Sequence, residues 1–177
     1  MEDFNELEWI NQFFDNGIDL QQNEGLDRIR NFALFWNMFE NFACANFANV
    51  TKIENFVEKL NGRTAITLEL VNPYLEYFID RYTIPNNQIN IDGLQFRDKR
   101  SDILARGKVL AVLERQVVTP KEILEALLLI LLRFRNNLFH GNKQIVNLEG
   151  QITNFTIANK LLAEVLTLMR QNHLISS

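Results

Sequence analysis

A short polar segment, Arg135-Asn136-Asn137-Leu138-Phe139-His140-Gly141, holds the side chains of this chain that are best suited to chemistry. A histidine titrates near neutral pH, so it can remove a proton from a hydroxyl group or donate one to a leaving oxygen. A guanidinium group can bind a phosphate and stabilise the charge that develops when an oxygen attacks phosphorus. Arg135 and His140 together therefore indicate proton transfer at a bound phosphate group.

The same residues also fit a well-capped helix end. Cationic side chains near a helix C-terminus interact favourably with the negative end of the helix dipole, and Arg133, Arg135 and His140 match this preference. Gly141 occupies the position where a left-handed residue ends many helices. Residue types and spacing alone leave both interpretations open, because short motif matches often arise by chance.

The helix that must position this segment begins at a capping box. Thr119, Pro120 and Glu122 match the N-cap, the first helical position and the third position after the cap. The following residues, 123–132, are apolar except for Glu125. An apolar surface on all sides is typical of a buried helix, so we predict that this helix lies at the centre of the fold.

The pattern Arg135-Asn136-x-x-x-His140 resembles the signature of the HEPN superfamily (higher eukaryotes and prokaryotes nucleotide-binding), in which an arginine, four to six residues and a histidine follow one another. The stretch Arg30 to Glu40 is similar to the aromatic-rich early helix of many such proteins. These resemblances cover two helices rather than the whole chain. They imply one all-α domain over residues 1–177, an antiparallel helical bundle, and a two-fold homodimer whose two motifs face each other.

The resemblance also implies a metal-independent endoribonuclease that cuts single-stranded or loop RNA, with Arg135, His140 and Asn136 as its catalytic residues. His140 would act as acid or base, and Arg135 would bind the scissile phosphate. The expected products are a 2′,3′-cyclic phosphate and a 5′-hydroxyl, and DNA should resist because it lacks the 2′-hydroxyl. We expect no metal or other cofactor, because the sequence has no cluster of metal-binding residues with ligand spacing.

Four further residues are candidates for substrate binding or for support of the site: Arg133, Asn137, Lys143 and Glu40. Arg133 is the rival of Arg135, since its distance from His140 also fits the family pattern. Glu40 lies at the edge of an aromatic stripe. Two alternatives are open for it, an ion pair with one of the two arginines or a solvated position at the rim.

One geometric problem concerns the motif itself. Residues five apart in a continuous helix point about 140° apart, so Arg135 and His140 would not share a face. Two solutions fit the sequence. Either the helix ends before His140, with Gly141 redirecting the chain, or residues from two chains meet at the site.

The composition indicates one soluble globular domain. The chain of 177 residues has room for a sizeable core, while its net charge of −4 argues against a protein that coats nucleic acid. Cys44 is the only cysteine and lies in an apolar run, so we expect a buried thiol in a reducing compartment. The sequence shows neither a secretory signal nor a membrane-spanning run, which predicts a cytoplasmic protein without a membrane partner.

Apolar periodicity predicts helices along most of the chain. The expected ranges are about 3–16, 25–46, 51–60, 73–83, 102–116, 119 to the motif, and 151–172. The helix from about Pro73 should have a helical or irregular lead-in. We expect the helix at 25–46 to pair with the central helix and the third helix to begin at Thr51. In the helix at 102–116 we expect Ile103, Leu104, Leu110 and Leu113 to face inward. Residues 84–93 should form the longest loop.

The most basic part of the chain contains Arg97, Lys99, Arg100, Arg106, Lys108 and Arg115. Such charges usually form a solvated helix surface. If they lie near the motif, they would instead bind a phosphate backbone and locally offset the negative charge of the protein.

The resemblance implies RNA and a second copy of the chain as partners. Family context suggests a toxin or a role in defence against phage or plasmids, with a separate antitoxin or regulatory protein as a further partner. The alternative is a noncatalytic HEPN-like module that dimerises or binds a nucleotide or a protein. A third interpretation is a purely structural helical bundle, in which Arg135 and His140 only stabilise a helix end.

Overall fold

All regular secondary structure in the described part of the chain is helical, which confirms the predicted all-α class. The structure is a computed structural model and describes residues 5, 8–9, 12, 24–139 and 151–175. The helices are α2 (Glu24–Cys44), α3 (Val50–Asn61), α4 (Leu68–Tyr82), the 3-10 turn η1 (Asp92–Leu94), α5 (Arg100–Leu113), α6 (Pro120–Phe139) and α7 (Ile152–Gln171). In these residues the one β-type contact is an isolated bridge between Thr83 and Ile89. The helix expected at 3–16 falls almost wholly outside the described residues.

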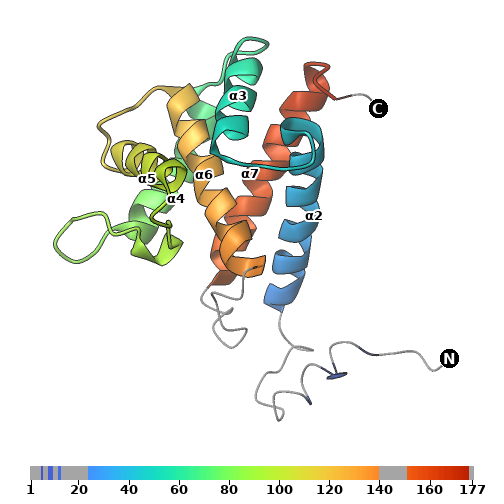
Figure 1. Ribbon diagram of the computed structural model, residues 1–177, viewed down its shortest axis with the longest axis vertical. Helices are drawn as coiled ribbons and strands as arrows, with labels where there is room; N and C mark the ends of the chain where they lie inside the picture. The colour runs from blue at the N-terminus through green and yellow to red at the C-terminus, as the bar shows by residue number, and fades with distance from the viewer. Residues whose placement is uncertain (1–4, 6–7, 10–11, 13–23, 140–150, 176–177) are drawn as a thin grey trace.

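The central helix is α6, as its apolar sequence predicts. It packs against α3, α4, α5 and η1, and Figure 1 shows it in the middle of the molecule. Every residue from Ile123 to Phe134 is at most 8% exposed. The predicted cap is also present, since the Thr119 hydroxyl accepts a hydrogen bond from the backbone N–H of Glu122 at 3.4 Å.

The helix α2 packs mainly against α7, not against α6 as the sequence led us to expect. Figure 1 shows α2 and α7 running in the same direction, while α6 runs opposite to α7. The expected antiparallel arrangement therefore describes α6 with α7 but not α2 with α7. The aromatic stripe of α2 predicts that one face is buried, but periodicity carries no information on which helix covers that face.

Aromatic rings join the helices into one core. The centroid distances are 5.9 Å for Phe78–Phe134, 6.0 Å for Phe134–Phe155, 5.1 Å for Phe32–Phe155 and 5.4 Å for Phe39–Phe56. These pairs connect α4 to α6, α6 to α7, α7 to α2, and α2 to α3. Each pair contributes about 0.5–1.5 kcal/mol beyond the burial of its surface. Phenylalanine side chains therefore form many of the contacts between the helices.

Two helix starts differ from those predicted. The cap of α3 is Asn49 rather than Thr51, because its side-chain oxygen accepts the N–H of Lys52 at 2.9 Å. The helix α4 begins at Leu68 and contains Pro73 in its interior. A proline removes one backbone hydrogen bond of a helix, but the packed apolar face of α4 outweighs this loss.

The inward face of α5 agrees with the prediction only in part: Leu113 is buried and Leu110 is half-buried, as expected. Ile103 and Leu104 are 58% and 57% exposed. The buried residues of this helix are Ala105, Val109, Val112 and Leu113. These buried residues repeat at helical spacing, so the sequence pattern is compatible with the observed face. The larger side chains of Ile103 and Leu104 favoured a different face in the prediction.

The end of α2 contains the one cysteine. Cys44 is 2% exposed, which confirms the predicted buried thiol. Burial, and then the charge of Glu40, raise the pKa of this thiol to about 12. The thiol is therefore protonated at neutral pH.

The three tyrosines of the chain, Tyr74, Tyr77 and Tyr82, all belong to α4. Burial raises the pKa of each phenol above its ordinary value near 10. The stabilisation that arises from these neutral phenols is present in full below pH 10 and is lost as the pH rises above it. We therefore expect tyrosinate absorbance to appear only together with the loss of helical circular dichroism. Ionisation near pH 10 with unchanged helicity would contradict this prediction.

Candidate functional site

Arg133 lies inside the protein and is 3% exposed. Its Nε donates to the carbonyl oxygen of Leu94 at 3.0 Å, its Nη2 donates to the carbonyl oxygen of Gln95, and its Nη1 pairs with Asp102 Oδ2 at 3.1 Å. The guanidinium carbon also lies 5.4 Å from the ring centre of Phe96. Burial lowers the pKa of Arg133, while the charge of Asp102 acts in the opposite direction. This arginine therefore fixes the η1 segment to α6.

Asn137 lies one turn later on the same face of α6. It is 1% exposed, and its side-chain nitrogen donates to the carbonyl oxygen of Leu94 at 3.0 Å. The same carbonyl oxygen accepts the hydrogen bond from Arg133 Nε. Both residues thus satisfy backbone oxygens of the connection between α4 and α5, and the structure places neither of them at the surface.

Arg135 points to a different side of α6. Two residues along a continuous helix differ by about 200° in direction, which separates Arg135 from Arg133. The Arg135 side chain is 27% exposed, and its Nη2 lies 3.9 Å from Glu40 Oε2. Its Nη1 donates to the side-chain oxygen of Asn136 at 3.3 Å. Of the two alternatives open for Glu40, the structure shows the ion pair, and the partner is Arg135.

Arg135 and Asn136 line an open cleft of about 400 Å³, which we name the motif cleft. It lies between the connection from α2 to α3, the start of α5 and the end of α6. Its lining residues are Phe47, Ala48, Asn49, Val50, Thr51, Arg97, Ser101, Asp102, Leu132, Arg135 and Asn136. A volume of this size falls within the range of about 300–1,000 Å³ that is usual for ligand pockets.

A second cation, Arg97, lines the motif cleft and is placed there indirectly by Arg133. Asp102 Oδ2 accepts a hydrogen bond from the backbone N–H of Arg97 at 3.0 Å. The same oxygen accepts from Arg133 Nη1. The Arg133 guanidinium therefore holds the Asp102 carboxylate in place, and this carboxylate holds the backbone at Arg97. Two arginines at one cleft favour an anionic ligand in an otherwise acidic protein.

Arg97 and three other basic residues of this region differ in their surroundings. Arg106 pairs with Asp92 at 3.6 Å, and Arg115 pairs with Glu76 at 2.7 Å. Lys108 pairs with Glu54 and Glu125. These three belong to ion pairs of the helix surface, whereas Arg97 belongs to the motif cleft.

His140, Gly141 and Lys143 lie outside the described residues, since the description of α6 reaches Phe139. His140 follows Phe139 directly in the sequence. Its catalytic role, that of Lys143, and the cap expected at Gly141 all stay predictions from the sequence.

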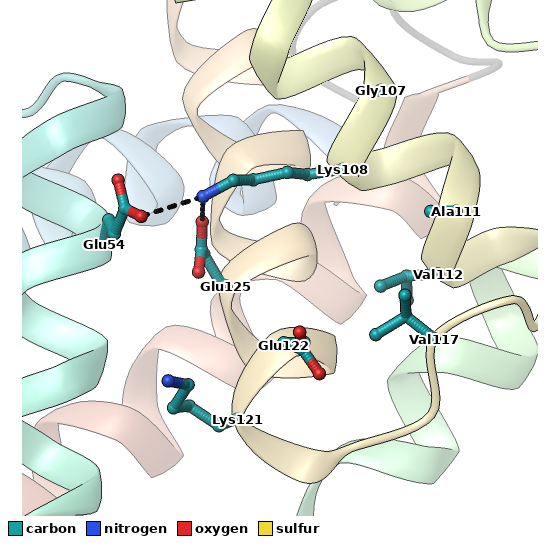
Figure 2. A pocket seen from close by; sticks show the side chains of 9 residues that line it. All are labelled: Glu54, Gly107, Lys108, Ala111, Val112, Val117, Lys121, Glu122 and Glu125. Atoms are coloured by element: carbon teal, nitrogen blue, oxygen red, sulfur yellow. Dashed lines mark hydrogen bonds and ion pairs between the residues drawn. The ribbon is translucent and has the colours of Figure 1, made fainter.

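A second pocket, of about 420 Å³, lies between α3, α5 and α6. Figure 2 shows Lys108 reaching across it to two carboxylates, with Nζ at 2.5 Å from Glu125 and 3.1 Å from Glu54. Burial lowers the pKa of Lys108, but the hydrogen bonds to the two carboxylates outweigh burial and raise it overall. Lys121 at the same pocket pairs with Glu58 at 2.8 Å. The ion pair with Lys108 thus compensates the charge of Glu125, which is otherwise surrounded by the apolar residues of α6.

Comparison with protein-family models, with curated proteins and with solved structures finds no match to this chain. Within the described residues, no group of three or more His, Cys, Asp and Glu side chains is arranged to hold a metal ion. None of the helices that the structure describes is long and apolar enough to cross a membrane.

Sequence reasoning identified Arg135 and Asn136 but not the opposite wall of their cleft. Phe47 and Thr51 come from the connection to α3 and from its first turn, more than eighty residues earlier in the chain. No local pattern marks Phe47, and the pattern at Thr51 indicates a helix start rather than a functional site. The run of basic residues indicated that Arg97 could bind phosphate, but it did not distinguish Arg97 from the basic residues beside it.

Proposed function

We propose that the protein is a metal-independent endoribonuclease whose active site is built on the motif cleft. The observation that carries the proposal is that Arg135 and Asn136 line one open cleft together with Arg97. The rival arginine, Arg133, is buried and bonded to the η1 segment. The motif that resembles the HEPN signature is therefore associated with a surface suited to phosphate.

In the proposed reaction the 2′-oxygen of RNA attacks the adjacent phosphorus, and the bond from phosphorus to the 5′-oxygen breaks. His140 takes the proton of the 2′-hydroxyl or gives one to the leaving 5′-oxygen. Arg135 binds the phosphate and stabilises the charge that develops on its oxygens. Asn136 accepts a hydrogen bond from Arg135 and so orients the guanidinium. The products are a 2′,3′-cyclic phosphate and a 5′-hydroxyl, and none of these roles requires a metal ion.

A homodimer belongs to this proposal. The resemblance to HEPN proteins implies two motifs that face each other across a two-fold axis, where one surface patch meets itself. One copy of His140 would then accept the proton from the nucleophile, and the other would donate to the leaving group. An RNA phosphate between the two arginines would reduce their mutual repulsion.

The proposal is tested by incubating a mixed RNA pool with wild-type protein and with His140→Ala in the presence of EDTA. We expect wild type to cleave RNA with cyclic-phosphate ends and His140→Ala to be at least about 100-fold slower. Both proteins must have the same helical circular dichroism and the same purity. An oligonucleotide with 2′-deoxyribose throughout should remain intact. Equal cleavage by both proteins would remove the catalytic assignment.

The second candidate function is a noncatalytic module that dimerises or binds a protein. It is favoured by three apolar residues at helical spacing on the surface of α2: Leu34, Met38 and Phe42 are 66%, 43% and 41% exposed. Met38 and Phe42 line a groove of about 570 Å³ between α2 and α7. Under this alternative, Met38→Glu disrupts association, whereas His140→Ala alters neither association nor biological activity.

A further inference from the structure

Phe47 stands at the rim of the motif cleft with 57% of its surface exposed. Single exposed apolar side chains are common on proteins, so exposure alone indicates little. The position of this ring is more informative, because it shares one cleft with two arginines. The ammonium group of Lys52 lies 5.8 Å from the ring centre, which holds a third cation nearby.

The backbone before Phe47 forms a turn. Ala45 and Asn46 have φ angles of 47° and 65°, in the left-handed region that asparagine adopts readily and alanine rarely. Left-handed residues are common directly after a helix, and here they end α2 and turn the chain toward Phe47. Here the N–H of Asn46 donates to the carbonyl oxygen of Glu40 at 2.8 Å, and Lys52 Nζ donates to that of Cys44 at 2.8 Å. The turn is thus fixed at its start and at its end.

The same turn is connected to Arg135 through one carboxylate. Glu40 Oε1 accepts the backbone N–H of Ala48 at 3.1 Å. Glu40 Oε2 lies 3.9 Å from Arg135 Nη2. One side chain therefore positions both the residue after Phe47 and the guanidinium of the motif. Glu40 therefore fixes the position of the Phe47 ring relative to the Arg135 guanidinium.

We propose that Phe47 stacks on an unpaired base of single-stranded RNA while Arg135 and Arg97 bind the adjoining phosphates. This inference rests on the proposed function and names the side chain that would select the single-stranded RNA implied by the resemblance. An aromatic ring beside cationic groups is the combination that binds single strands, because every base has an aromatic face and every nucleotide a phosphate. The faces of paired bases are covered in a duplex, so the arrangement selects for unpaired RNA.

The test measures binding rather than cleavage, so that it stays separate from the proposed chemistry. All proteins carry His140→Ala, and fluorescence anisotropy reports the binding of a short single-stranded RNA of mixed sequence. We expect Phe47→Ala to raise the Kd about 5- to 150-fold and Phe47→Trp to restore binding. Val118→Ala is the matched control, since Val118 is also 57% exposed and lies outside the motif cleft. Thermal unfolding of each variant checks that the fold is retained.

Further ligands separate stacking from phosphate binding. An oligomer of abasic sugar-phosphates and an RNA duplex should bind Phe47→Ala and the parent protein equally. Single-stranded DNA of the same sequence should show the same dependence on Phe47, because stacking does not involve the 2′-hydroxyl. Equal effects of Phe47→Ala on single strands and on abasic oligomers would overturn the stacking role.

The outcomes for function and for stacking are distinguishable. If Arg135→Ala weakens RNA binding and Phe47→Ala does not, the stacking inference fails while the proposed function stands. If Phe47 is required for binding but the protein with His140 intact never cleaves RNA, the proposed function fails while the stacking inference stands. If the His140→Ala protein does not bind single-stranded RNA and the protein with His140 intact does not cleave it, both are wrong.

Discussion

Arg135→Ala should lower the rate of RNA cleavage by about 10²- to 10³-fold, as expected when one group that stabilises the transition state is removed. The free energy of unfolding should fall by less than the about 3–5 kcal/mol that is typical of breaking a fully buried pair. The ion pair with Glu40 is long at 3.9 Å and its arginine is 27% exposed, although Glu40 itself is only 12% exposed. Glu40 also keeps its hydrogen bond from the N–H of Ala48. Single-turnover cleavage and urea unfolding of the same preparation measure the two quantities.

Two control variants sharpen this prediction. Arg135→Lys keeps the charge but loses the forked pair of donors, so it should recover only part of the rate. Arg63→Ala removes an exposed arginine just beyond the C-terminal end of α3 and away from the motif cleft, and it should leave the rate unchanged. An Arg135→Ala protein that is folded and fully active would exclude this residue as the catalytic arginine.

The helices that the sequence predicts well are those with local signals. The capping box at Thr119 and the apolar run behind it define the start and the burial of α6. The periodic apolar residues of α7 predict both its range and its inward face. These features depend on neighbours three or four residues away, which the sequence displays directly.

The arrangement of the helices depends on contacts between distant parts of the chain, and here the prediction is less successful. Nothing local to α2 indicates that Phe32 meets Phe155 rather than a residue of α6. Pro73 suggested a helix start, yet the packed face of α4 extends the helix back to Leu68. Tertiary packing outweighed the local preference at this position.

In the candidate site, too, local features could be predicted from the sequence, whereas contacts between distant residues could not. Helical geometry alone separates Arg133 from Arg135, but it does not say which of them faces solvent. Arg133 is the buried one because oxygen atoms of Leu94, Gln95 and Asp102 accept its hydrogen bonds. These residues lie about thirty to forty positions earlier in the chain. Phe47 and Arg97 likewise reach the motif cleft only through the fold.

Arg133→Ala should have the opposite profile to Arg135→Ala, with a large loss of stability as its first effect. Removing the guanidinium leaves Asp102, whose side chain is 17% exposed, without its buried partner. The carbonyl oxygen of Gln95 loses its donor, and the carbonyl oxygen of Leu94 keeps only the bond from Asn137. Breaking a buried pair in this way typically costs about 3–5 kcal/mol. Urea unfolding at neutral pH measures the loss.

The reason for the loss can be tested by removing the carboxylate as well. Asp102→Asn in the Arg133→Met background eliminates the uncompensated charge, so the double variant should be more stable than Arg133→Met alone. Cleavage should be impaired in both variants, because Arg133 no longer holds the side chain at position 102 that accepts the backbone N–H of Arg97. Arg133→Ala with wild-type stability and a selective loss of the chemical step would reverse the assignment, making Arg133 the catalytic arginine and Arg135 its support.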